Sequence, residues 1–241
     1  MVQVQNLSFT YPDGRQALQG IELAIAAGEK VGLVGDNGAG KSTLLLHLNG
    51  ILRGKGSLYV DGLELREDTL RAIRARVGLV FQDPDDQLFS PTVFDDVAFG
   101  PLNMGLPESE VRERTAWALE QVGMADYAQR MPHHLSLGEK KRVAIATVLS
   151  MQPAILALDE PSAGLDPRAR ASLMALLQGL PQTMLIASHD LEFVQELCCR
   201  AVVLDRGRVM ADMPLDGCDI AAIYLRQQAA GSGSWPRDSR D

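Results

Sequence analysis

The segment from Gly35 to Thr43, with the sequence GDNGAGKST, constrains the fold of this chain more than any other part of it. It follows the apolar run Val31–Val34 and fits the pattern G-x-x-x-x-G-K-[ST], which joins a strand to a helix. Glycines let the backbone N–H groups curl around an anion without a Cβ in the way. The helix that begins near Gly40 points its positive end at the same anion. The sequence therefore predicts an α/β fold with a phosphate-binding loop.

Each residue type in this loop has a chemical reason to be there. Lys41 supplies a full positive charge for the β- and γ-phosphates of a nucleotide, and Ser42 offers a hydroxyl to Mg²⁺. The alternative, a glycine-rich turn without a ligand, would not need a lysine aimed at the centre of the loop. The residues expected to contact the phosphates are Gly35, Asn37, Gly38, Ala39, Gly40, Lys41, Ser42 and Thr43.

Length and charge narrow the class of protein. With 241 residues the chain is long enough for one large α/β domain, or for one with an inserted lobe. Its net charge of −8 disfavours a nucleic-acid partner, which would normally meet a basic face. No apolar run approaches the roughly 18–20 residues that span a bilayer, and Met1–Thr10 lacks the pattern of a signal peptide. Cys198, Cys199 and Cys218 are expected to be reduced thiols.

The pattern along the chain predicts an α/β core split by a helical insert. Residues 1–83 and 154–217 carry the α/β core together with a β subdomain, whereas residues 84–153 have helical spacing. We expect a C-terminal helix over residues 218–230 and a flexible tail over residues 231–241. Strands are expected at Val2–Thr10, Ala17–Ala26, Gly56–Val60, Val77–Phe81, Ile155–Leu158, Met184–Ser188 and Ala201–Leu204, and helices at Lys41–Asn49, Glu108–Val122, Glu139–Leu149, Arg168–Leu177 and Leu191–Leu197.

Two carboxylates follow the buried strand Ile155–Leu158. Open α/β sheets place their ligands at the carboxyl ends of the strands. Asp159 can hold the Mg²⁺ shell, directly or through water, and Glu160 can polarise an attacking water. In isolation, two acids at a strand end could instead cap a helix. After a phosphate loop, the hydrolytic interpretation is favoured.

Further motifs occur in a fixed order, and with them the chain resembles the ATPases of ABC transporters from about Val2 to Asp212. Leu135–Glu139, followed by residues 140–146, is similar to the family signature LSGGQ, although Leu137 stands where the family usually has glycine. Ser162–Asp166 resembles the D-loop. The remaining matches are Gln82 to the Q-loop glutamine, His189 to the switch histidine, and Tyr11 to the aromatic residue that stacks on adenine.

This resemblance implies a P-loop NTPase (RecA-like) core with an N-terminal antiparallel β subdomain and an inserted helical subdomain, in a single ABC ATPase domain over residues 1–230. It implies ATP hydrolysis with Mg²⁺, in which two copies, or this chain and a paralogous ATPase, pair head to tail. Residues carried over as catalytic are Glu160, His189, Lys41 and Gln82, and those carried over as metal-binding are Ser42, Gln82 and Asp159. Tyr11, Ser136, Gly138, Glu139 and Asp166 complete the nucleotide-binding set. The resemblance implies that Ser136 and Gly138 meet the phosphate loop of the other copy and that Asp166 lies at the seam between the copies.

Simpler structural roles stay open for several of these residues. Ser136 can cap the helix that follows, with Glu139 completing a capping box, and such a helix start also binds anions. Leu137 would be strained if its position required a positive φ. The run Lys140–Arg142 is expected to form a solvated helix face, and His133–His134 is expected not to bind metal, since neighbours on a helix face different ways.

The stretches 83–89 and 92–101 resemble the energy-coupling-factor importers, which take up cobalt or nickel ions or vitamins. The resemblance implies a groove for helices of an integral membrane subunit, and a peripheral position on the cytoplasmic face of the membrane. The apolar residues Leu88, Phe89, Val93, Phe94 and Phe99 suit such a helix-in-groove contact, or else form the core of the lobe. The alternative function is a soluble ABC ATPase that acts on DNA or ribosomes, but a single cassette without a heptad run argues against it.

Overall fold

The computed structural model describes residues 2–216 and 220. The strands are β1 (Val2–Thr10), β2 (Gln16–Ile25), β3 (Lys30–Val34), β4 (Lys55–Val60), β5 (Leu63–Glu64), β6 (Val77–Val80), β7 (Ile155–Asp159), β8 (Thr183–Ala187), β9 (Arg200–Asp205) and β10 (Arg208–Pro214). The α-helices are α1 (Lys41–Leu48), α2 (Leu70–Arg76), α3 (Val93–Asn103), α4 (Glu108–Gln121), α5 (Leu137–Leu149), α6 (Pro167–Gly179) and α7 (Leu191–Leu197). Short 3₁₀ helices are η1 (Pro84–Asp86), η2 (Ala125–Tyr127) and η3 (Pro132–His134).

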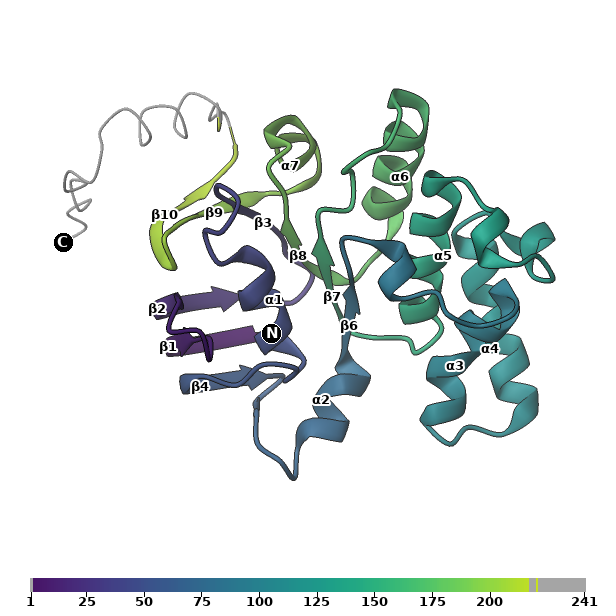
Figure 1. Cartoon of the computed structure of the whole chain (residues 1–241), viewed down its shortest axis with the longest axis horizontal. Helices are drawn as coiled ribbons and strands as arrows, with labels where there is room; N and C mark the ends of the chain where they lie inside the picture. Colours follow the sequence, from purple (N-terminus) through teal and green to yellow (C-terminus); the bar gives the residue numbers. More distant parts are fainter. Residues whose placement is uncertain (1, 217–219, 221–241) are drawn as a thin grey trace.

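The larger sheet carries the predicted chemistry at one edge. Its strand order is β10-β9-β3-β8-β7-β6, and all neighbouring pairs are parallel except β10 with β9. The carboxyl ends of the four strands β3, β8, β7 and β6 therefore meet at the same edge (Figure 1). The chain continues from them into the glycine-rich loop, His189, Glu160 and Gln82.

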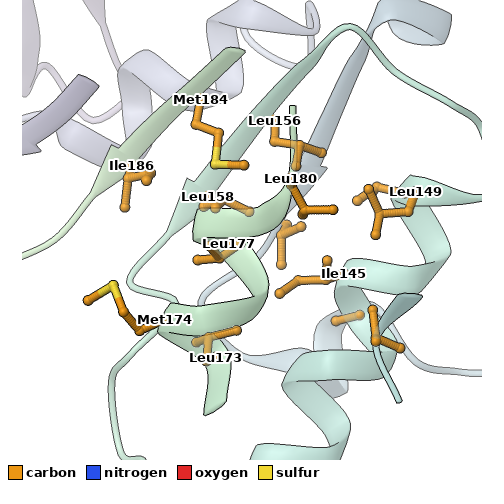
Figure 2. Close-up of a cluster of buried hydrophobic side chains, with 14 of the residues drawn as sticks. Ile145, Leu149, Leu156, Leu158, Leu173, Met174, Leu177, Leu180, Met184 and Ile186 are labelled. Atoms are coloured by element: carbon orange, nitrogen blue, oxygen red, sulfur yellow. The ribbon is translucent and has the colours of Figure 1, made fainter. Parts of the chain in front are cut away.

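The strands of this sheet are buried on both faces, which explains their continuous apolar sequences. In β7, Leu156 and Leu158 face one core, whereas Ile155 and Ala157 face the other. Figure 2 shows the first core, where α5 and α6 cover the sheet. Its labelled members are Ile145, Leu149, Leu156, Leu158, Leu173, Met174, Leu177, Leu180, Met184 and Ile186. The second core lies between the same sheet, α1, α2 and the smaller sheet.

The smaller sheet has the order β2-β1-β4-β5 and is antiparallel throughout. Its hairpin between β1 and β2 carries Tyr11, where the Tyr11 N–H donates to the Arg15 carbonyl at 2.9 Å. The Gln19 N–H donates to the Gly207 carbonyl at 2.7 Å and so joins this sheet to the turn between β9 and β10. Tyr11 is thereby held beside the glycine-rich loop.

The helices α3, α4 and α5 pack together at one side of the molecule, drawn in teal in Figure 1. The predicted fold class is confirmed: an α/β core, an antiparallel sheet near the N-terminus and a helical part. The sequence pattern did not identify α2, α3 or β10 as separate elements, although it predicted helical structure over residues 84–153. The C-terminal helix predicted over 218–230, apart from Ile220, and the tail over 231–241 lie outside the described residues. Among the described residues, no helix combines the length and apolar character required to cross a membrane.

One expectation on helix α5 is wrong. The run Lys140–Arg142 is not a solvated face, because Lys141 is only 5% exposed and its side chain points into the protein. The helix also begins at Leu137, two residues before its predicted start, because Ser136 caps it. The basic run in the sequence therefore does not reveal that the ammonium of Lys141 is buried.

Candidate nucleotide site

The glycine-rich loop between β3 and α1 is shaped to receive an anion. Gly38 and Gly40 have φ angles of 84° and 109°, in the left-handed region that side chains disfavour. A Cβ on Gly40 would also lie 2.6 Å from the carbonyl oxygen of Ala17. Gly40 is the N-cap of α1 and offers no side chain to cap it. The first N–H groups of α1 are therefore available to a bound anion.

A cavity of about 320 Å³ opens over this loop. The predicted site residues that line it are Tyr11, Asn37, Gly38, Gly40, Lys41, Ser42, Thr43, Gln82, Glu160 and His189. Gly35 and Ala39 are buried and support the loop from behind, since a Cβ on Gly35 would lie 2.3 Å from the Leu204 carbonyl oxygen. The residues Arg15, Gln16 and Ala17 also line the cavity. The sequence analysis missed these three, because they belong to no motif and reach the cavity only through the fold of the hairpin.

The side chains of Lys41, Glu160 and His189 lie in a row across the cavity floor. The Lys41 ammonium donates to the carbonyl oxygens of Gly35, at 2.7 Å, and Asp36, at 3.3 Å. It lies 3.7 Å from Oε1 of Glu160, and both side chains are 6% exposed. Oε2 of Glu160 lies 2.8 Å from Nδ1 of His189, whose own side chain is largely exposed. A buried carboxylate needs such a partner, because an isolated one would lose its hydration without compensation.

The backbone of Glu160 is in an unusual conformation. Its φ is 44°, which is uncommon for a residue with a side chain and characteristic of functional sites. Two backbone hydrogen bonds hold it: the Glu160 N–H donates to Ala187 at 2.9 Å, and the Ala163 N–H donates to the Glu160 carbonyl at 3.1 Å. This turn directs the carboxylate back over the end of the sheet.

Asp159 and Ser42 fit a divalent cation. Burial raises the pKa of Asp159, an effect that a hydrogen bond with Ser42 opposes. Within the part of the chain that the structure describes, Oδ1 of Asp159 is buried and has no hydrogen-bond partner. A buried, unpartnered carboxylate oxygen beside a hydroxyl is the oxygen-rich environment that Mg²⁺ prefers. Gln82 lines the adjoining cavity and can contribute its amide oxygen.

Tyr11 is oriented by its neighbours. Its hydroxyl is 3.0 Å from Oγ1 of Thr43, and Phe9 meets its ring edge to face at 4.9 Å between centroids. The guanidinium of Arg15 lies 4.8 Å from the ring centroid. The ring thus stands at the rim of the cavity, where a planar base could stack on it.

The signature residues line a second cavity, of about 390 Å³, which shares no lining residue with the first. Ser136, Gly138, Glu139 and Asp166 are all part of this lining. The expected capping box is confirmed: the Glu139 N–H donates to Oγ of Ser136 at 3.4 Å, and the Ser136 N–H donates to Oε2 of Glu139 at 2.8 Å. Hydrogen bonds from the Ser136 hydroxyl and N–H hold the pKa of Glu139 below its usual range.

Leu137 fits this turn without strain. It is the first residue of α5 and does not have a positive φ, so the leucine in place of glycine costs no backbone energy. Its side chain is partly exposed, and its Cδ2 lies 3.0 Å from where a Cβ of Gly164 would be. Leu137 therefore covers the D-loop segment from the signature side.

The apolar residues expected to form a groove separate into two groups. Leu88 and Val93 are buried in the core of the helical part. Phe89 and Phe99 are 66% and 49% exposed, and their rings meet edge to face at 5.0 Å between centroids. They line a hollow of about 880 Å³. Of the five apolar residues predicted for the groove, Phe89 and Phe99 are therefore the exposed ones, and Phe94 is half-buried.

Comparison with known proteins identifies the family. Residues 18–163 match the model of the ABC transporter family. An energy-coupling factor transporter ATP-binding protein of Methanothermobacter thermautotrophicus is 52% identical over 218 residues, which cover 88% of this chain and 70% of that protein. The structure of CbiO1 from Clostridium perfringens, part of the ABC transporter complex CbiONQ, has a TM-score of 0.82 and 40% identity, and covers 95% of this chain and 93% of that one.

A second solved structure is a dimeric ATP-binding cassette in a post-hydrolysis state, bound to ADP and Pi. It has a TM-score of 0.79 and 30% identity, and the match covers 89% of this chain and 99% of that one. The family match spans the glycine-rich loop and the carboxylates of β7, so these comparisons concern the same site as the geometry above. The chain belongs to the ABC transporter family, of which it is an ATP-hydrolysing member.

Proposed function

We propose that this chain powers a membrane importer of the energy-coupling-factor type for cobalt or nickel ions or a vitamin, and that it hydrolyses ATP as a head-to-tail pair with itself or a paralogous ATPase. The observation that carries the pairing is the division of the nucleotide contacts between two cavities with no residue in common. A γ-phosphate in the first cavity of one copy would meet Ser136 and Gly138 of the other. The named relatives support the importer type.

The residues of the first cavity divide the chemistry. The Lys41 ammonium exchanges its hydrogen bonds to the Gly35 and Asp36 carbonyls for contacts with the β- and γ-phosphates. The first N–H groups of α1 bind the same phosphates. Glu160 orients the attacking water and receives its proton. The His189 side chain exchanges its contact with Glu160 for one with the γ-phosphate. Tyr11 stacks on the adenine.

Mg²⁺, held by Ser42, Asp159 and Gln82, would neutralise charge on the phosphates when bound. What the protein contributes is mostly positioning and preorganised charge, because phosphoryl transfer needs little covalent participation from side chains. The αL turn at Glu160 fixes the carboxylate before the substrate arrives.

ATP then acts as a bridge between two copies. A ligand that binds both surfaces stabilises the pair by its affinity for them, and hydrolysis removes that stabilisation. Capping of α5 by Ser136 leaves the start of this helix directed into the second cavity, where it can receive the partner's phosphate. The pair would therefore close on ATP and open after hydrolysis.

The hollow lined by Phe89 and Phe99 is the proposed docking site of the membrane subunit. Docking there would place this chain on the cytoplasmic face of the membrane. Two exposed aromatic rings in contact form an anchor of the kind found at helix-in-groove interfaces. Acidic residues Asp68 and Asp86 lie in the lining and would favour basic segments of a partner, although Arg71 and Arg74 lie there as well.

The decisive experiment is co-purification from detergent-solubilised membranes. The wild-type chain should retain integral membrane proteins, and Phe89→Asp should lose most of them while its own unfolding temperature and nucleotide binding are unchanged, because Phe89 is exposed. Ile51→Asp, at another exposed apolar residue outside this lining, is the matched control and should retain them. Equal retention by both variants would contradict the docking site, and recovery of ribosomes or DNA in place of membrane proteins would contradict the importer.

A further inference from the structure

Lys141 has an environment that its place in a basic run does not reveal. It lies in α5, five residues after Ser136, with its ammonium in the protein interior. The Lys141 Nζ donates to the carbonyl oxygen of Glu160 at 2.9 Å and to that of Gln82 at 3.3 Å. One side chain of the signature helix thus contacts the backbone of two residues assigned to hydrolysis in the same chain.

Burying an ammonium is costly, so this contact needs a compensating gain. Burial lowers the pKa of Lys141, and the negative charges of Glu160, Asp83 and Asp159 oppose this shift by favouring the ammonium form. The hydrogen bonds themselves go to main-chain carbonyls and not to these carboxylates. The side chain therefore restrains the backbone at Glu160 and Gln82 and leaves the carboxylate of Glu160 to His189 and Lys41.

The carbonyl oxygen that accepts from Lys141 belongs to a residue whose backbone conformation depends on its neighbours. This residue is Glu160, with a φ of 44°, a conformation that persists only where neighbours determine it. The Ala163 N–H already donates to the same oxygen at 3.1 Å from within the turn. Lys141 adds the hydrogen bond that comes from the helical part, so a shift of α5 would pull directly on this turn.

We propose that Lys141 is a positioning residue that ties the signature helix to the chain's own hydrolytic site. When the ATP of the partner binds at Ser136, the start of α5 is fixed, and Lys141 fixes the Glu160 turn and Gln82 with it. Nucleotide bound at one interface site then sets the geometry of the water-activating carboxylate at the other. This inference rests on the proposed pairing and adds the route by which the two sites communicate.

The test separates positioning from simple stability by using a second lysine of the same kind. Lys30 also donates to two carbonyl oxygens, those of Leu177 and Gln178, both at 2.8 Å, at the end of α6. It does not line either nucleotide cavity. Lys141→Met and Lys30→Met each remove an ammonium from two carbonyls, so they form a matched pair.

For Lys141→Met we expect kcat to fall about 10- to 100-fold, because a small misplacement of a reacting group has effects of this size. The KM for ATP and ATP-dependent pairing should stay within about twofold of wild type, since no Lys141 atom contacts the nucleotide cavity. Lys30→Met should lower the unfolding temperature with kcat unchanged. Lys141→Arg, which keeps a buried cation with several donors, should recover much of the lost kcat.

Equal kcat for Lys141→Met and Lys30→Met would overturn the positioning role. A loss of kcat that simply follows the fraction of unfolded protein in both variants would overturn it as well. If Lys141→Met does not fold, Lys141→Gln gives the same comparison with a polar end that cannot span both carbonyls. The same pairing assay reports on the proposed function separately: wild-type protein that turns over ATP without ever pairing would contradict the pairing and this inference together, whereas normal pairing with unaltered kcat in Lys141→Met contradicts the inference alone.

Discussion

Glu139 places a negative charge beside the serine that is expected to meet the γ-phosphate. Its carboxylate accepts hydrogen bonds from both the hydroxyl and the N–H of Ser136, at 2.7 and 2.8 Å. Those two bonds hold the pKa of Glu139 below its usual range, so the carboxylate is ionised at neutral pH. The chain thus keeps the helix cap at the cost of repulsion toward an incoming phosphate.

Removing this charge should strengthen ATP-dependent pairing. Glu139→Gln keeps an oxygen that can accept from Ser136 and loses the charge, and a like-charge repulsion of about 1 kcal/mol in a solvent-facing site corresponds to about fivefold in affinity. We expect the ATP concentration that gives half-maximal pairing to fall by about that factor. Light scattering measures it in a Glu160→Gln background, where we expect hydrolysis to be stopped. Glu139→Ala is the comparison, since it removes the charge together with the two hydrogen bonds from Ser136 and leaves the Ser136 cap on the backbone N–H of residue 139. Weaker pairing of Glu139→Gln than of the parent would contradict the repulsion.

The sequence predicts individual residues well where a motif fixes their chemistry. Lys41, Ser42, Glu160 and His189 meet at one edge of the sheet because each follows a parallel strand, and strand order alone brings them together. The burial of Lys141 could not be predicted, because a run of three basic residues does not show which of them faces the protein interior. Arg15 reaches the cavity only through the geometry of a hairpin.

Among the elements, α7 depends on its first residue. Asp190 is the N-cap of α7, where Oδ1 accepts the Phe193 N–H at 2.9 Å. Arg170 of α6 donates to both oxygens of the same carboxylate, at 2.9 and 3.2 Å. Burial opposes ionisation of Asp190, but these hydrogen bonds outweigh it and lower the pKa. One carboxylate therefore joins two helices next to His189.

This arrangement predicts a dependence of stability on pH. Because the pKa of Asp190 is lower in the folded protein, its contribution is fully present above the unfolded pKa of about 3.9 and is lost as pH falls through the folded value. Asp190→Asn should lower the free energy of unfolding by about 1–2 kcal/mol at pH 7. The difference from wild type should persist to about pH 5 and shrink below about pH 4. Urea unfolding across this range measures it.

The control for this prediction is Glu192→Gln. Glu192 also pairs with Arg170, at 3.3 Å, but its side chain is 77% exposed. An exposed pair of this kind contributes little, about 0.5 kcal/mol or less. A loss for Glu192→Gln as large as that for Asp190→Asn would mean that general charge balance, and not the cap of α7, sets the stability.

Helices and strands could be predicted from the sequence where burial gives their apolar residues a regular spacing. The β7 run ILALD reads as a buried strand because alternate residues serve two cores. Strand β10 has an alternating half-exposed pattern with polar residues and pairs only at a sheet edge, so its sequence carries a weak signal. Helix α2 is seven residues long and buries only Ile73, too little for a helical period to stand out.

At the scale of the whole molecule, the proposed pairing requires one chain to hold one half of each of two different sites. The cavity with Lys41 and Glu160 and the cavity with Ser136 and Gly138 share no residue. In a head-to-tail pair, each interface site takes one half from each copy. A defect in the phosphate loop and a defect in the signature therefore damage different sites, depending on which chain carries them.

This logic makes a prediction that only the head-to-tail arrangement allows. A chain with Lys41→Ala lacks the phosphate lysine, and a chain with Gly138→Asp puts a carboxylate at the turn before the partner's phosphate. Each variant alone has no intact site and should be inactive. In a mixed pair, the signature of the Lys41→Ala chain faces the phosphate loop of the Gly138→Asp chain, and that one site is whole. Random mixing gives mixed pairs in half of the cases with one of two sites working, or about a quarter of wild-type ATPase activity.

The measurement is steady-state ATP hydrolysis by the two variants after co-expression, with differently tagged copies purified in tandem so that only mixed pairs remain. Tandem purification should raise the expected activity from about a quarter to about half of wild type, because every pair then holds one intact site. A control pair with Lys41→Ala and Gly138→Asp in the same chain, beside a wild-type copy, has no site with both halves intact, because each interface joins one damaged half to one sound half. If both mixtures are equally inactive although mixed pairs are recovered, the two cavities do not complete each other across the interface, and the order of the halves deduced from this single chain is wrong.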